Sequence, residues 1–438
     1  MNTGDTAWVL ASSALVLLMT PGLAFFYGGM VRSKSVLNML MMNFVTIGIV
    51  SLLWVLYGFS VAFGNGKSGL WGGLDWAGMK HMTAVETTLN GSVYGIPLLV
   101  FAAFQLMFAV ITPALISGAI ADRAKFGAWM VFVVLWVTIV YFPVAHWVFD
   151  FGDKNGVGAG WLAHRGVLDF AGGTAVHVNA GAAGLALCLV LGKRIGWKKD
   201  PMRPHNLTLV MLGAGLLWFG WFGFNAGSAL GANALAGQAF FTTMIATATA
   251  MLGWLAVERL RDGHFTSLGA ASGAVAGLVA ITPACAFVTP IGSVVLGLLA
   301  GAVCAMAVGL KWKLGFDDAL DVVGVHLVGG ALGAISLGFI SNYSGTEGLF
   351  YGGSISVLGN QALAVLSVGG YSFIVAYILG KLIDMTMGFR ITEEEEVEGI
   401  DLFAHAETGY DIHSAGTGAG ALSSSIKQAD AEARGVNA

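Results

Sequence analysis

Charged residues are scarce in this chain, and their scarcity excludes the commonest class of fold. Lys, Arg, Asp and Glu make up 11% of the 438 residues, whereas 56% are apolar. The charged share is about half that of an average soluble domain. A water-soluble fold is therefore excluded, and the composition predicts one polytopic membrane domain.

The residues that usually mark cofactor, metal and nucleic-acid sites are also missing. Cys188, Cys285 and Cys304 lie in apolar runs without CxxC spacing, so the sequence encodes neither a disulfide framework nor a zinc site. The net charge of −4 comes without the concentrated basic face of nucleic-acid-binding proteins. We expect no cofactor, no metal and no nucleic-acid partner.

The sequence consists largely of long apolar runs. A membrane span needs about 20 mainly apolar residues, and eleven such runs lie at residues 7–31, 36–63, 95–120, 127–146, 168–191, 207–230, 238–257, 267–287, 290–310, 319–340 and 357–386. The sequence predicts an all-α polytopic membrane protein with eleven transmembrane helices. Residues 1–390 form the membrane domain, and residues 391–438, which begin with an acidic run, form a cytoplasmic C-terminal tail.

The basic residues indicate the orientation, because short cytoplasmic loops carry an excess of Lys and Arg. With the N-terminus outside, only Lys67, Lys80, Lys154 and Arg165 of the 21 basic residues lie on the outer side. The inner side holds all the others: Arg32, Lys34, Arg123, Lys125, Lys193, Arg194, Lys198, Lys199, Arg203, Arg259, Arg261, Lys311, Lys313, Lys381, Arg390, Lys427 and Arg434.

Two short repeats indicate that the chain has two related halves. The segment ITPA occurs at residues 111–114 in span three and at residues 281–284 in span eight. Asp169 precedes His177 by eight residues in span five, and Asp318 precedes His326 by eight in span ten. Both signals predict an inverted repeat of spans 1–5 and 6–10, followed by a final helix. Eight helical residues climb about 12 Å, so both histidines should reach mid-membrane from opposite sides.

The predicted span centres contain no Asp, Glu, Lys or Arg, and only His177 and His326 are deep ionisable residues. A neutral histidine that merely packs is one interpretation of each. Two histidines at matched depth in an inverted repeat favour function, because burying an ionisable group in a membrane is costly. Imidazole is a donor and an acceptor that can stay neutral, so the interior favours a small molecule that sheds its charge or carries none.

Aromatic and small residues surround this pair. Phe104 and Phe108 lie one turn apart in span three, and span six carries WFGWFGFNAGS at residues 218–228. Aromatic faces can hold a partly dehydrated cation. Small residues let helices approach closely, and we assign to packing the glycines that flank the histidines: Gly173, Gly181, Gly184, Gly329, Gly330 and Gly333.

These motifs resemble the Amt/MEP/Rh ammonium transporter family, most closely its bacterial Amt branch. The resemblance extends from span one into the tail and rests on PGLAFFYGGMVRSKSVLNM (21–39), LDFAGGTAVHVNAGAAGL (168–185), PHNL (204–207), GWFGFNAGSA (220–229), TPAC (282–285), DVVGVHLVGG (321–330) and EEEEVEGIDLFAHAETGY (393–410).

The resemblance implies a pore in each subunit and a role for particular residues. His177 and His326 match the twin-histidine pair, and Phe108 and Phe224 match the stacked phenylalanine gate. Ser228 matches the hydroxyl of an outer ammonium recruitment site that also includes Phe108, and Asp169 matches the aspartate beneath it. Where the family has a recruitment-site Trp, this chain has Phe149, with Trp147 and Trp161 as nearby aromatic candidates.

The resemblance also implies a homotrimer in a bacterial cytoplasmic membrane and a tail that contacts a PII-type regulatory protein. The expected function is transport of ammonium or methylammonium: ammonium is recruited outside and deprotonated, and ammonia is conducted past the histidines. Whether the proton follows stays open. The rival hypotheses are a channel for a neutral solute such as water, carbon dioxide or urea, an ammonium sensor, and an intramembrane enzyme, for which no nucleophile, carboxylate pair or metal cluster stands out.

Overall fold

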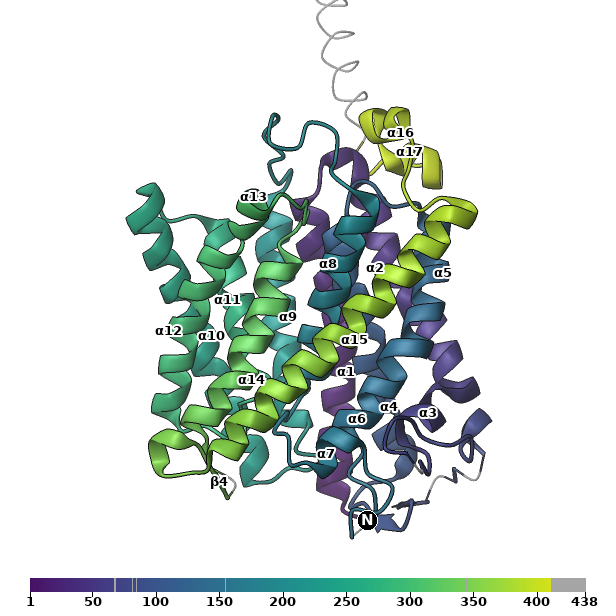
Figure 1. The fold of residues 1–438 in the computed structure, drawn as a ribbon, viewed down its shortest axis with the longest axis vertical. Coiled ribbons are helices and arrows are strands. Elements are labelled where there is room, and N and C mark those ends of the chain that lie inside the picture. Colours follow the sequence, from purple (N-terminus) through teal and green to yellow (C-terminus); the bar gives the residue numbers. More distant parts are fainter. Residues whose placement is uncertain (67, 81, 84, 154, 344, 411–438) are drawn as a thin grey trace, which may run out of the picture.

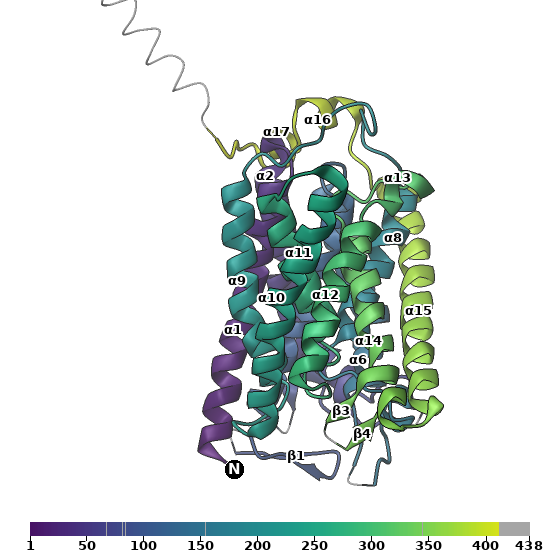
Figure 2. The ribbon, with the colours of Figure 1, turned by 90° about the vertical axis from the view of Figure 1, so that its left-hand side faces the viewer.

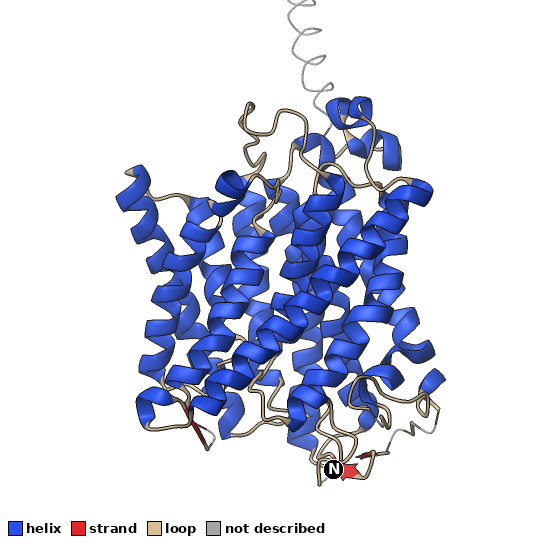
Figure 3. Cartoon of the chain, viewed as in Figure 1, coloured by secondary structure: helices blue, strands red, loops and turns tan. Residues whose placement is uncertain are grey.

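The computed structural model describes residues 1–66, 68–80, 82–83, 85–153, 155–343 and 345–410. Part of the predicted tail, residues 411–438, lies outside the described residues, as do Lys67, Lys154, Lys427 and Arg434 from the basic residues used for the orientation. The described chain is a bundle of long helices with a few short strands (Figures 1 and 3).

Each half of the bundle contributes five spans. Those of the first half are α1 (Thr3–Met30); α2 (Val36–Leu53), η2 (Trp54–Gly58) and α3 (Phe59–Phe63); α4 (Leu98–Ser117) and η4 (Gly118–Ile120); α5 (Phe126–Trp136), η5 (Val137–Tyr141) and α6 (Phe142–Phe149); and η6 (Gly173–Val178) with α8 (Asn179–Leu191). Those of the second half are α9 (Leu207–Gly227); α10 (Ala234–Asp262); α11 (Ser267–Ile281); α12 (Pro290–Ala307) with α13 (Leu310–Leu314); and η7 (Val323–Leu327) with α14 (Val328–Ile340).

The remaining elements follow the repeat or lie at the two ends of the bundle. They are the final span α15 (Ile355–Met387); the tail helices α16 (Glu393–Glu398) and α17 (Ile400–His405); the short helices η1 (Ser33–Ser35), η3 (Ala77–Met79), α7 (Trp161–His164) and η8 (Leu349–Tyr351); and two antiparallel strand pairs, β1 (Thr88–Leu89) with β2 (Ser92–Val93) and β3 (Asn342–Tyr343) with β4 (Thr346–Glu347).

The eleven predicted spans are confirmed. Ten helical segments within the described residues are long and apolar enough to cross a membrane, and α11 is a shorter apolar helix. The span predicted at 267–287 is therefore too long. Its helix ends at Ile281, and residues 282–287 form turns. Pro283 explains the end, because proline has no backbone N–H to donate to the preceding turn.

Helix α10 is longer than predicted, because it extends beyond both limits of the span predicted at 238–257. Asn233 begins it by accepting a hydrogen bond from the Ala236 amide, and Gly263 ends it with a positive φ of 79°. The last turn contains Arg259 and Arg261. Cationic side chains are favourable at the C-terminal end of a helix, so this helix continues past its apolar core.

The two halves pack against each other through equivalent helices. Helix α1 lies along α9, its counterpart in the second half (Figure 2). The contact is close because Gly213 faces Phe26, where an added Cβ would lie 2.3 Å from the backbone nitrogen. The η6–α8 span likewise packs against η7–α14.

The paired spans run in opposite directions, as an inverted repeat requires. Helix α8 ends at the end of the bundle that carries α16 and α17, whereas α14 ends beside β4 at the end that carries the N-terminus (Figure 1). The N-terminus and the tail helices thus lie at opposite ends, and α15 crosses the bundle diagonally (Figures 1 and 3).

Candidate functional site: a buried pathway through the bundle

The two predicted deep histidines meet inside the bundle. The Nδ1 atoms of His177 and His326 are 3.2 Å apart, and the rings are nearly parallel, with centroids 5.3 Å apart. Both side chains are buried. Each histidine lies in a π-helical stretch, η6 or η7, and such stretches often occur at functional sites.

The segments before the two histidines correct one sequence-based expectation. Asp169 and Asp318 were expected to begin eight helical residues, but helix starts only at Gly173 and near Val323. The reason is that each aspartate acts from outside its helix and accepts hydrogen bonds from the first backbone amides. The Asp169 carboxylate accepts from the four amides of residues 172–175 and from the Thr174 hydroxyl, and Asp318 accepts from the amides of residues 322 and 323.

Aromatic rings form a continuous series of contacts with the histidine pair. Phe108 stacks on Phe224 with centroids 4.2 Å apart and a tilt of 34°. Phe224 lies 6.1 Å from the His177 ring, and Trp221 stacks on that ring at 5.4 Å. The sequence placed Trp221 in an aromatic run but gave it no part in the site. Its proximity to His177 depends on how α9 packs in the bundle, which the sequence does not reveal.

Two small cavities adjoin the histidine pair. One, with a volume of about 10 Å³, is lined by residues that include Trp221, Phe224, Leu217 and both histidines. The other has a similar volume and is lined by residues that include Tyr27, Asp321 and His326. Such a volume is about that needed to hold one water-sized molecule. His326 lines both cavities, so space for a very small molecule lies on either side of it.

Three of the predicted recruitment residues, Phe108, Phe149 and Ser228, lie at the end of this ring series away from the histidine pair. Phe149 packs against Phe108 with centroids 6.5 Å apart, and the Ser228 hydroxyl donates to the Phe224 carbonyl at 2.8 Å. Trp147 and Trp161 contact each other, and Trp147 donates to the Leu70 carbonyl. Of the three aromatic candidates, Phe149 is the one that contacts Phe108.

Asp169, the remaining predicted site residue, caps the helix that carries His177. Its carboxylate oxygens are occupied by the backbone amides and the threonine hydroxyl named above, and the side chain is buried. A carboxylate at a helix N-terminus compensates the unsatisfied amides and the helix dipole. Asp169 therefore fixes the start of the helix that carries His177.

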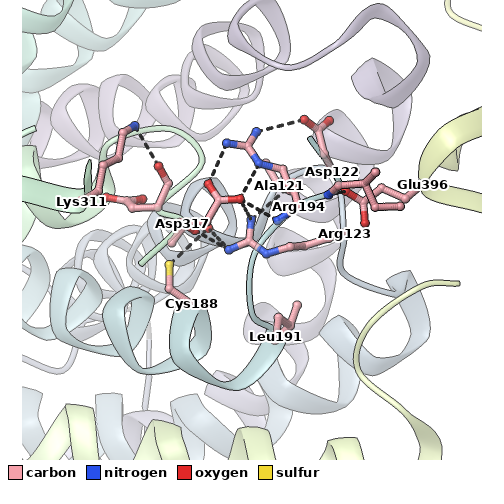
Figure 4. A network of polar contacts seen from close by, with 12 residues as sticks. Ala121, Asp122, Arg123, Cys188, Leu191, Arg194, Lys311, Asp317 and Glu396 are labelled. Atoms are coloured by element: carbon pink, nitrogen blue, oxygen red, sulfur yellow. Dashed lines mark hydrogen bonds and ion pairs between the residues drawn. The ribbon is translucent and has the colours of Figure 1, made fainter. Parts of the chain in front are cut away.

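An ionic network that includes Glu396 of α16 lies at the end of the bundle that carries the tail helices, and Figure 4 shows its side chains. Arg194 binds both carboxylate oxygens of Asp317, at 2.9 and 2.8 Å, and also Asp122 at 3.2 Å. Burial alone would raise the pKa of Asp317, but the hydrogen bond from Arg194 and the charges of Arg123 and Arg194 lower it below its usual value. The network joins loops of both halves.

The tail enters the same network. The Glu396 carboxylate accepts from the Ile195 amide and from Arg390, each at 2.7 Å. Asp401 accepts from the amides of Leu37 and Asn38 at the start of α2. The sequence signalled these residues only as basic loops and an acidic run, because their pairing joins segments far apart in the chain.

Known proteins share this architecture. The model of the ammonium transporter family matches residues 7–410. The chain belongs to the ammonium transporter family. An ammonium transporter of Mycobacterium tuberculosis (strain H37Rv) is 57% identical over 93% of this chain and 90% of its own length, and one of Bacillus subtilis is 47% identical over 94% and 99%.

Solved structures agree with the family assignment. A structure described as a sensor Amt protein has a TM-score of 0.84 and 30% identity, over 92% of this chain and 98% of its own. Mep2 of Candida albicans has a TM-score of 0.80 and 34% identity, over 90% and 88%. As a member of this family the chain is a multi-pass membrane protein that transports ammonium, and it is not an enzyme.

Proposed function

We propose that the chain recruits ammonium at its outer end, removes a proton and conducts ammonia past the histidine pair. Phe108, Phe149 and the Ser228 hydroxyl hold the cation before it loses its proton. Ammonia then passes Phe224 and the two imidazoles. The proposal is supported by the short contact between His177 and His326 beside two cavities of molecular size.

The hydrogen bonding of the pair explains how it serves a neutral molecule. When both rings are neutral, one Nδ1–H donates to the other Nδ1. The donating ring then has a bare Nε2, and the accepting ring has an Nε2–H, so the pair offers one acceptor and one donor. Ammonia can both donate and accept. The Nε2 of His177 is buried and has no hydrogen-bond partner among the described residues, which leaves it available to such a molecule.

Uptake measurements test the proposed role of the pair. Methylammonium and ammonium uptake by His177→Ala and His326→Ala should fall well below that of the native protein at equal amounts of assembled protein. His264→Ala is a matched control, because His264 is exposed, and its uptake should be unchanged. Native uptake in both pore variants would refute the role of the imidazoles.

The fate of the proton requires a separate measurement. Either the proton is left outside and ammonia crosses alone, or the proton travels along the imidazoles and transport carries charge. Purified protein in liposomes should give an ammonium-dependent current in the second case and none in the first. Competition by methylammonium distinguishes both schemes from a channel for water, carbon dioxide or urea.

A sensor is the second candidate function. It is favoured by the fold match to the structure described as a sensor Amt protein and by the contacts of α16 with Ile195 and of α17 with the start of α2. Ammonium uptake by the purified protein alone would exclude a sensor that does not transport. Absence of uptake, with ammonium-dependent changes in the tail, would favour it.

The assembly and location form a further part of the proposal. The chain forms a homotrimer in a bacterial cytoplasmic membrane, with the N-terminus outside and a cytoplasmic tail from residue 391 that meets a PII-type regulatory protein. The opposite positions of the N-terminus and tail helices and the predominance of basic residues on the tail side support this orientation. The mass of the solubilised complex and the labelling of introduced cysteines from each side test it.

A further inference from the structure

The second copy of the repeated segment ITPA is linked to the histidine pair through Trp221. We propose that Thr282 is a positioning residue for His177: its hydroxyl fixes the indole of Trp221, and the indole fixes the imidazole. The inference rests on the proposed function, because it assigns Thr282 a part in transport only if the imidazoles take part. Nothing in the family assignment specifies this role.

The direction of each hydrogen bond at Thr282 is determined by its partners. The Thr282 Oγ1 lies 2.7 Å from the Leu278 carbonyl oxygen and 2.8 Å from the Trp221 Nε1. A carbonyl only accepts and an indole N–H only donates. The hydroxyl proton must therefore point to Leu278, and an oxygen lone pair accepts the indole N–H. One rotamer of the hydroxyl satisfies both bonds, so the indole is held in a single direction.

The held indole bears directly on His177. The two rings are stacked with an interplanar angle of 20° and centroids 5.4 Å apart, and Trp221 and Thr282 are both buried. Trp221 also lines the cavity beside the pair. Because protein interiors are close-packed, a change in the tilt of the indole is passed to the imidazole that it covers.

The same segment supports the His177 helix from a second side. Pro283 packs on Gly173, the first residue of η6, where an added Cβ would lie 2.4 Å from the proline ring. The Pro283 carbonyl also accepts from the Phe170 amide at 3.2 Å. Pro283 thus contacts the start of η6, and its neighbour Thr282 acts on the His177 imidazole through Trp221. This arrangement gives the repeated segment a purpose beyond ending α11.

The first copy of the segment provides an internal contrast. Thr112 in α4 donates to the Phe108 carbonyl one turn earlier, at 2.7 Å, as Thr282 does to Leu278. The bond within the helix is therefore common to both copies. The bond to the indole belongs to Thr282, and it is the acceptor function of this hydroxyl that a variant must remove.

Replacing Thr282 by Val keeps the branched shape and removes the acceptor. The buried indole N–H then loses its partner, which is unfavourable, and the indole tilts toward another acceptor. We expect uptake to fall about tenfold, because even a small misplacement of a functional group is costly. Thr282→Ser retains the hydroxyl and should restore most of the uptake.

Spectroscopy tests the positioning step without reference to transport. With ¹⁵N-labelled tryptophan, the Trp221 Nε1–H resonance is assigned by its loss in Trp221→Phe. It should shift in Thr282→Val and return in Thr282→Ser. Thr247→Val is the matched control, because Thr247 is a buried threonine of α10 that donates to the Thr243 carbonyl. An unshifted resonance in Thr282→Val would overturn the inference.

Uptake then links the bond to transport. Trp221→Phe should lower uptake, and adding Thr282→Val to it should cause little further loss, because the bond is already absent.

Native uptake in Thr282→Val, while His177→Ala is impaired, would overturn the positioning role and leave the proposed function intact. Native uptake in all of these variants, His177→Ala included, would instead refute the proposed function. If Thr282→Val does not assemble, Thr282→Ala takes its place: additive losses in Thr282→Ala and Trp221→Phe would overturn the inference, and non-additive losses would support it.

Discussion

Asp169 and Asp318 occupy equivalent places in the two halves, yet their carboxylates are used differently. Asp169 accepts from four backbone amides and one hydroxyl. Asp318 accepts from two amides and lies beside Lys311, which binds its carbonyl oxygen and the Asp321 carboxylate. The repeat thus preserves the position of a helix cap, while the hydrogen bonding that fixes it is denser in the first half.

The largest predicted effect tests this difference. Asp169→Asn turns an acceptor into an NH₂ group that faces backbone amides, so at least one buried amide loses its partner. We expect a loss of stability of about 3 kcal/mol, measured by SDS titration in mixed micelles. Asp318→Asn should cost less, because fewer amides depend on its carboxylate.

Equal losses in the two asparagine variants would contradict the comparison. Thr174→Val is the control, because it removes only the hydrogen bond from the Thr174 hydroxyl to Asp169. All four amide bonds stay in place. It should cost less than Asp169→Asn.

The second comparison concerns two glycines where the histidine-bearing helices cross. The sequence assigned both to packing, and their surroundings confirm this. An added Cβ at Gly181 would lie 2.4 Å from the Leu327 backbone nitrogen, and one at Gly330 would lie 2.8 Å from the Gly173 carbonyl oxygen and 3.0 Å from the His177 Cβ. Each half therefore lets the other half's histidine segment approach.

Alanine at either glycine should separate the imidazoles. We expect Gly181→Ala to cost about 2 kcal/mol of stability, and Gly330→Ala less, because overpacking forces the backbone to shift and the approach at Gly181 is closer. Uptake should fall with stability in both. Gly215→Ala is the control, since a Cβ there meets no atom within 4 Å. Unchanged uptake in Gly181→Ala would contradict the close-packing argument.

These pairs also show how much the sequence could predict. The number of spans follows from hydropathy, and the opposed halves follow from the two repeated motifs, because both signals can be read from the order of the residues alone. The isolation of His177 and His326 in the apolar spans singled them out. Their roles, and those of Phe108, Phe149, Phe224 and Ser228, stay predictions.

Other features could not be read from the sequence, because they depend on contacts between distant segments. The bond from Trp221 to Thr282 joins residues in different spans, and the Arg194–Asp317 pair joins the two halves. The expected helix from Asp169 to His177 is wrong for a local reason: Gly172 has a φ of 113°, and the Asp169 carboxylate caps a helix that starts only at Gly173. Periodicity does not reveal such a cap.

A pH dependence should distinguish the two aspartates further. Burial and the nearby Asp321 raise the pKa of Asp318 to about 6, although Lys311 opposes this. An unfolded aspartate titrates near about 3.9. Between these values the folded state keeps a proton that the unfolded state has lost. Stability from this group is therefore present below about pH 4 and is lost as the pH rises to 6.

The measurement compares the native chain with Asp318→Asn at pH 5 and pH 7. The native chain should lose about 1 kcal/mol more than the variant over this interval, because the variant does not titrate there. A pH-independent difference between the two proteins would show that Asp318 is not the titrating group.

The smallest predicted effect concerns the tail, which contacts both the first half and the loop between the halves. Glu396 is buried and accepts from the Ile195 amide and Arg390, and Arg32 of the first half lies 3.9 Å away. Glu396→Gln keeps an acceptor but removes the charge that pairs with Arg390 and Arg32. If the tail is coupled to the pore, uptake should fall about twofold, a loss of about 0.4 kcal/mol, and deletion beyond Arg390 should lower it further while the proposed trimer still assembles. Glu398→Gln is the matched control, because Glu398 is an exposed residue of the same helix.

Unchanged uptake after the deletion would mean that the tail contacts the bundle without influencing the pore, and that the two halves alone determine transport.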